Sequence, residues 1–211
     1  MTASITHCWR NARLDLLGLI AGACLVWGHL GSAHAEAPIT EVSPLRFERA
    51  GDAVLLSAAI KFELPVVVEE ALLKGIPMIF VAEADVFRER WYWTNKRVAG
   101  AERHMRLAYQ PLTRRWRLNV ASGLITNAGL GVALNQNFEA LSEALAALQR
   151  LSRWKIADVS ELDLEQRHFV AFRFRLDMSQ LPRPFQIGTL GQTEWNISVS
   201  SSQPLILESG P

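Results

Sequence analysis

Few residues of this chain have the types and spacing that catalysis or metal binding requires. Beyond residue 35 the only imidazoles are His104 and His168, and neither has a second ligand at a recognised spacing. Ser122 and His104 could assemble with an acid, but the G-x-S-x-G pattern of hydrolases is absent. Gly129 and Gly131 lack the third glycine of a nucleotide loop. We therefore expect no enzyme activity, no metal and no cofactor.

An aromatic cluster has the chemistry of binding rather than of catalysis. Trp91, Tyr92 and Trp93 are consecutive, and Arg90 and Lys96 lie close to them in the sequence. Such rings offer a large contact area with a polar handle, which suits a sugar, a peptidoglycan fragment or an apolar peptide. Alternation along a strand would instead bury Trp91 and Trp93 on one face and leave Tyr92 on the other. We favour this packing interpretation.

A basic cluster is spread over the polar faces of three expected strands. Its members are Arg106, Arg115, Arg117, Arg173 and Arg175. If the strands are neighbours, the guanidinium groups form a face that binds phosphate or carboxylate. The alternative is a solvated face paired with Glu83, Asp85 and Glu89, in which each ion pair contributes about 0–1 kcal/mol. The balanced charge of the chain favours this alternative.

The elements that must position these clusters are mostly strands. Period-two alternation and turn residues predict strands over 39–48, 53–62, 76–87, 103–110, 114–120, 168–176 and 193–200. The clearest hairpin turns near Pro111, and Gly51 suits the turn between the first two strands. We expect loops over 122–135 and 158–165, and a polar tail after residue 200.

Helical periodicity occurs in only two places. Pro65 suits the first turn of a short helix that stops at Gly75. A longer helix follows Asn137, its expected N-cap, because Phe138, Leu141, Leu145, Leu148 and Leu151 recur at spacings of three and four. These elements predict a mostly β (α+β) fold, a β-sandwich-like domain with about two helical insertions. A small closed β-barrel is the alternative.

The first 35 residues have the basic, apolar and small-residue regions of a secretory signal peptide. Cleavage is expected after Ala33-His34-Ala35, leaving residues 36–211 as a single globular β-rich domain. The alternative is an uncleaved segment anchored to the inner membrane, but the apolar run 16–27 is shorter than the roughly 20 residues of a spanning helix. A lipoprotein signal ending at Cys24 is disfavoured, since leucine is missing three positions before it.

Export has consequences for the expected domain. Cys8 and Cys24 are both removed with the signal, so no disulfide can stabilise what remains. Removing Arg10, Arg13 and Asp15 leaves equal numbers of acidic and basic side chains. Because a balanced domain lacks the positive field that nucleic acids attract, no nucleic-acid partner is expected. The predicted location is the periplasm.

Several segments together resemble one bacterial family. They are the signal end Ala33-His34-Ala35, the run VVVEEALLKGIPMIF after Leu64-Pro65, the aromatic turn at 90–93, and the segments YQPLTRRWRL and FRFRLDMSQLPRPFQI. In this combination the chain resembles the exported proteins of domain of unknown function 4390, often labelled proline-rich signal peptide proteins. The resemblance implies export and a link to a membrane sensor kinase of the nitrogen-regulation type, beside which members are often encoded. It implies no activity and no catalytic residues.

These observations favour a noncatalytic periplasmic interaction module of the cell envelope. Its expected partner is the extracytoplasmic part of a membrane protein, such as a sensor kinase, and its candidate surface is formed by the aromatic and basic clusters. The alternative is a periplasmic carrier of a small ligand or lipid, with a pocket formed by apolar strand faces and the Trp-rich turn. An envelope enzyme is the third, disfavoured hypothesis.

Overall fold

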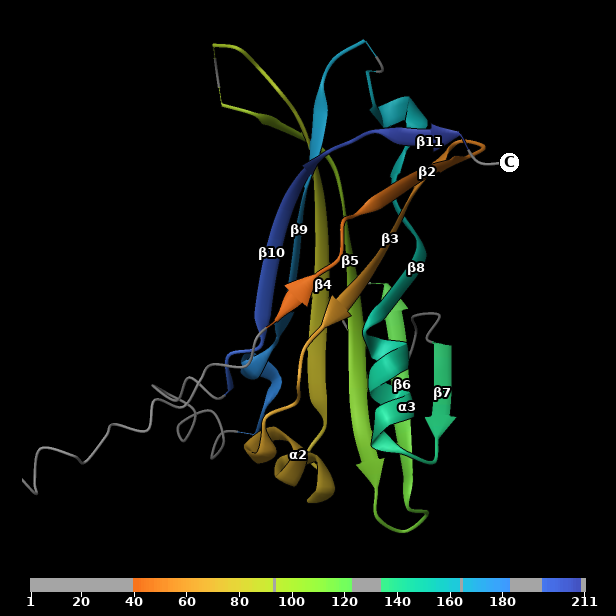
Figure 1. Cartoon of the computed structure of the whole chain (residues 1–211), viewed down its shortest axis with the longest axis vertical. Coiled ribbons are helices and arrows are strands. Elements are labelled where there is room, and N and C mark those ends of the chain that lie inside the picture. The colour runs from red at the N-terminus through yellow and green to blue at the C-terminus, as the bar shows by residue number, and fades with distance from the viewer. Residues whose placement is uncertain (1–39, 93, 123–133, 164, 183–194, 210–211) are drawn as a thin grey trace, which may run out of the picture. The chain divides into compact units, whose positions relative to one another are not determined.

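The computed structural model describes residues 40–92, 94–122, 134–163, 165–182 and 195–209. Its contacts divide the chain into residues 1–36 and 37–211, and all the described residues belong to the second unit (Figure 1). The predicted signal peptide, with its cleavage residues Ala33 and Ala35, lies outside the described residues and stays a prediction.

The second unit contains two open sheets. In the smaller sheet, β3 (Ala53–Lys61) pairs antiparallel with three strands, β1 (Glu41–Val42), β2 (Arg46–Ala50) and β8 (Arg150–Asp158). β11 (Leu207–Ser209) pairs in parallel with β2. The larger sheet has the antiparallel order β10 (Ser198–Pro204), β9 (His168–Leu176), β4 (Met78–Arg88), β5 (Lys96–Gln110), β6 (Arg115–Ser122) and β7 (Leu134–Phe138).

The core lies between the inner faces of the two sheets, because buried side chains of β3 and β8 join those of β4 and β5 in one cluster. Alternation along β9 buries His168, Val170, Phe172, Phe174 and Leu176, as the sequence predicts. Phe62, Phe80 and Phe174 form a triangle with ring centroids 5.6–5.7 Å apart. The mostly β, sandwich-like prediction is therefore confirmed. The closed-barrel alternative is wrong, since neither sheet closes on itself in the described part of the chain.

In the described part of the chain two α-helices accompany the sheets, and one matches its prediction closely. α2 (Val66–Leu73) follows Pro65 and ends before Gly75, whose φ of +83° favours glycine. α3 (Leu141–Leu148) is shorter than predicted and begins after Ala140. Asn137, the expected N-cap, belongs to β7 instead. Two short 3₁₀ helices, η1 (Val159–Glu161) and η2 (Met178–Gln180), follow β8 and β9.

β8, with nine residues, is the longest of the strands that sequence reasoning missed. Leu148 and Leu151 are both buried at a spacing of three, which imitates a continuing helix, although α3 has already ended. Arg153 has a φ of +44°, and the register against β3 shifts nearby. This irregularity interrupts the period-two pattern by which a strand is recognised. It explains why the predicted helix extends to Leu151 and why no strand is predicted over residues 150–158.

Other boundaries differ from the predictions. The strand expected over 39–48 is broken into β1 and β2 around Pro44, which has no N–H for a ladder. β5 begins at Lys96 rather than at residue 103, and β10 ends at Pro204 rather than at residue 200. The expected polar tail contains β11. Of the loop expected over 122–135, residues 123–133 lie outside the described residues.

Candidate functional site

The connection between β4 and β5 carries two exposed aromatic rings. Trp91 is 93% exposed and Tyr92 is 66% exposed, and their rings meet edge to face at 4.5 Å. The packing interpretation is therefore wrong for Trp91, because β4 ends at Arg88 and its alternation does not reach the aromatic run. Trp93 lies outside the described residues. We call Arg90, Trp91 and Tyr92 the aromatic tip.

The base of the aromatic tip is held to the rest of the domain. Glu89 N–H donates to the Arg167 carbonyl at 2.9 Å, and Arg90 N–H donates to Asn95 Oδ1 at 3.4 Å. A hollow of about 640 Å³ beside the tip is also lined by Arg88 and Gln166. The tip thus combines a fixed backbone with exposed rings and basic neighbours, an arrangement suited to contact with another molecule.

The five predicted arginines fall into two separated groups. Arg173 and Arg175 lie on β9, whereas Arg106 lies on β5 and Arg115 and Arg117 lie on β6. β4 is hydrogen-bonded between β9 and β5, so the two basic groups are not on neighbouring strands. Period-two alternation and the register place all five on the outer face of the larger sheet.

Carboxylates neutralise the group on β9. Glu83, on the intervening strand β4, lies 3.3 Å from Arg173 and 3.1 Å from Arg175. Arg175 is also 3.5 Å from Asp177. Glu83 therefore pairs with arginines on a solvated sheet face, as the alternative interpretation of the basic cluster predicts. Asp85 pairs elsewhere, with Arg97 at 2.7 Å.

The group on β5 and β6 has weaker partners. Arg115 lies 3.7 Å from Glu139, and Arg117 Nε donates to Asn137 Oδ1 at 3.3 Å. Arg106 has no ion pair among the described residues. A single anion site built from all five arginines is therefore not formed, because β4 and its carboxylates stand between the groups.

Both histidines are buried. His104 is 3% exposed, its Nε2 is 3.6 Å from Glu102, and His168 Nδ1 contacts the Gln166 carbonyl at 3.0 Å. The register pairs Ser122 with Arg103 and places His104 opposite Ala121. Ser122 and His104 thus face opposite sides of the sheet and do not form a hydrolytic pair. No group of acidic, histidine or cysteine side chains suited to a metal occurs within the described residues.

Arg103 is a charged residue on the inner face that sequence reasoning passed over. Its guanidinium carbon lies 5.1 Å from the centre of the buried Trp154 ring. Burial lowers the pKa of Arg103 from its usual value, because desolvation disfavours the charged form. The sequence contained the signal for it, since Arg103 is two residues before Met105 and shares its strand face.

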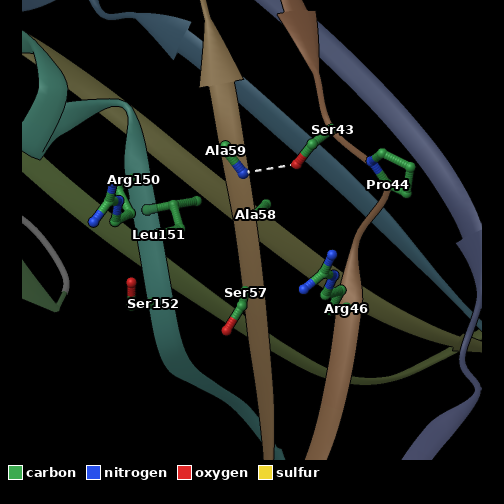
Figure 2. Close-up of a pocket in the computed structure, with 9 residues that line it drawn as sticks. All are labelled: Ser43, Pro44, Arg46, Ser57, Ala58, Ala59, Arg150, Leu151 and Ser152. Carbon is green, nitrogen blue, oxygen red and sulfur yellow. Dashed lines mark hydrogen bonds between the residues drawn. The ribbon is translucent and has the colours of Figure 1, made fainter.

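Figure 2 shows a hollow on the smaller sheet that the sequence also did not indicate. It has a volume of about 400 Å³, and Arg46 on β2 and Arg150 on β8 stand on either side of Ala58 and Ala59 of β3. Ser43 Oγ accepts a hydrogen bond from Ala59 N–H at 2.8 Å. Neither Arg46 nor Arg150 has an acidic partner among the described residues.

Comparison with known families decides where the chain belongs. The model of a domain of unknown function, DUF4390, matches residues 37–203. The chain is a member of the DUF4390 family. The match includes the aromatic tip, the five arginines, Arg103 and Arg150, and thus nearly the whole of the sandwich. No curated protein and no solved structure matches.

Membership of the DUF4390 family does not assign an activity, because the family is described only as a domain of unknown function. Nothing in its described residues indicates enzymatic activity. Within the same residues, none of the helices has the length and apolar character needed to cross a membrane.

Proposed function

We propose that this DUF4390 chain is a noncatalytic interaction module of the cell envelope that acts in the periplasm. Its aromatic tip would dock on the extracytoplasmic part of a membrane protein, with a membrane sensor kinase as the first candidate. The single observation that carries this proposal is the exposure of Trp91, which is 93% exposed to solvent. An exposed tryptophan beside an exposed tyrosine is costly to leave in water and marks a contact site.

The composition of the tip supports docking. Trp, Tyr and Arg are the residue types that most often dominate the energy of protein interfaces, and all three are consecutive at positions 90–92. The tip stands between β4 and β5, the two longest strands described, which have 11 and 15 residues. Because its base is hydrogen-bonded to Arg167 and Asn95, little backbone order would be lost on binding.

The chemistry of the remaining candidates supports a noncatalytic role. The two histidines are buried on opposite faces of the larger sheet, and Ser122 does not share a face with His104. The periplasmic location rests on the signal-like segment 1–35 and its small residues at 33 and 35.

The experiment that tests this function is site-specific photo-crosslinking in the living host. A photoreactive phenylalanine replaces Tyr92 in one strain and Arg117, on the outer sheet face, in another. We expect one membrane protein to be captured from position 92, and its capture to fall at least tenfold when Trp91→Ser is added. Equal capture with and without Trp91, or capture only from position 117, would refute docking through the aromatic tip.

A further inference from the structure

A groove opens where the larger sheet extends beyond the smaller one. β8 is the edge strand of the smaller sheet in the described part of the chain, and α3 lies over β6 between β8 and β7 (Figure 1). The uncovered part of the larger sheet forms the floor of a hollow of about 540 Å³, which we call the inter-sheet groove. Its size lies within the range of roughly 300–1,000 Å³ that is usual for small-ligand sites.

The groove has two cationic side chains without counterions. Arg103 projects from β5 and Arg150 from the start of β8, and neither has an ion pair or hydrogen bond to its guanidinium among the described residues. Arg103 contacts the Trp154 ring instead of a carboxylate. None of the described residues that line the groove is acidic. Arg103 is partly buried whereas Arg150 is exposed, and a partly buried cation without a counterion is unfavourable unless an anion pairs with it.

The rest of the groove is largely apolar. Leu118 and Val120 continue the inner face of the larger sheet, and Ala146 and Ala147 of α3 form the opposite wall. Leu134 on β7 is 65% exposed beside them. Leu118 is itself buried, but the exposed apolar surface of Val120 and Leu134 would be stabilised by burial against a hydrocarbon chain, since each buried CH₂ contributes to binding.

We propose that the inter-sheet groove binds a single-chain amphiphile with an anionic head, which pairs with Arg103 and Arg150 while its hydrocarbon chain covers Val120 and Leu134. Guanidinium groups bind carboxylate and phosphate through paired N–H donors, so both heads share this chemistry. Ser152 adds a hydroxyl at the same end of the groove. Arg150 and Ser152 also line the hollow of Figure 2.

This ligand site is independent of the aromatic tip. It supports the alternative of a small-ligand or lipid carrier, but it places the ligand in the inter-sheet groove and not at the Trp-rich turn. The anion would convert Arg103 from an isolated cation into a member of an ion pair in a partly dry site, where such pairs are stronger than at the surface. The groove and the tip could therefore both serve the same protein, one for a ligand and one for a partner.

Calorimetric titration of the purified protein tests the proposal. The probes are decanoate, decyl phosphate and the neutral decyl glucoside, whose chains are matched in length, each kept below its micellar concentration. We expect one equivalent of an anionic probe to bind, and decyl glucoside to bind at least tenfold more weakly. Tighter binding of decanoate would assign a carboxylate head, and tighter binding of decyl phosphate a phosphate head. Binding of neither anion, or equal binding of the neutral probe, would overturn the proposal.

Matched variants locate the site. Arg103→Met and Arg150→Met keep an aliphatic stem, and each should weaken the anionic probe at least tenfold. Arg153→Met is the control, because it removes the same charge from β8 but from a guanidinium already held by Glu48 at 3.0 Å. Circular dichroism establishes that each variant is folded. Unchanged binding in both Arg103→Met and Arg150→Met, or an equal loss in Arg153→Met, would contradict the assignment.

Discussion

Phe174 lies where the two sheets meet, and replacing it tests how the sandwich is held together. Its side chain is fully buried, and its ring centroid is 5.7 Å from Phe80 in the same sheet and 5.6 Å from Phe62 at the end of β3. Phe174→Ala should lower the free energy of unfolding by about 3–5 kcal/mol. That is a large share of the roughly 5–15 kcal/mol available to a domain. Phe174→Leu keeps more apolar volume and should cost on the order of 1–2 kcal/mol.

A double-mutant cycle isolates the contact between the sheets. Phe62→Leu, Phe174→Leu and the double variant are unfolded in urea, with tryptophan fluorescence as the signal. We expect the two substitutions to couple by about 0.5–1.5 kcal/mol, the usual value of an aromatic pair beyond its buried area. Phe169→Leu on the outer face is the control and should combine additively with Phe62→Leu. A Phe62–Phe174 coupling below about 0.3 kcal/mol would refute the packing described here.

Four further predictions concern single residues. Glu83→Gln should lower stability by about 1 kcal/mol, since it leaves the two arginines of β9 without their shared carboxylate, and urea unfolding in 1 M salt should shrink the difference. Gly100→Ala should cost about 1 kcal/mol in the same assay, because its Cβ would displace the Arg97 guanidinium from its ion pair. Trp91→Ser should change stability by less than about 0.5 kcal/mol, as its exposure implies. Ala35→Gln should block removal of residues 1–35, which mass spectrometry of the exported protein would detect.

The elements that the sequence predicted well are those with a local and regular pattern. β3, β4 and β9 have apolar residues at nearly every second position along their inner faces, and this pattern is read from each strand alone. α2 is bounded by Pro65 and Gly75, whose backbone preferences mark helix ends in any context. Strand number and patterning predicted a mostly β domain, but only the sheet topology distinguishes the sandwich from a barrel.

The elements that the sequence did not predict depend on neighbours that are distant in the chain. β8 pairs with β3 about a hundred residues away, and its irregularity at Arg153 removes the local pattern. The separation of the arginines follows from the order of the strands, in which β4 lies between β9 and β5. The inter-sheet groove arises because one sheet is wider than the other. Alternation with Met105 places Arg103 on the inner face, but only the order of the strands shows that a groove opens there.

The last two strands connect the sheets in a way that constrains how the domain can form. β10 completes the edge of the larger sheet beside β9, and β11, only a few residues later, pairs with β2 near the other end of the unit's sequence. Such distant pairings make folding slow, since a long loop must close before they contribute. A chain still emerging from the ribosome lacks both strands and cannot complete the sandwich. For a protein proposed to be exported, this delay favours passage across the membrane before the domain closes.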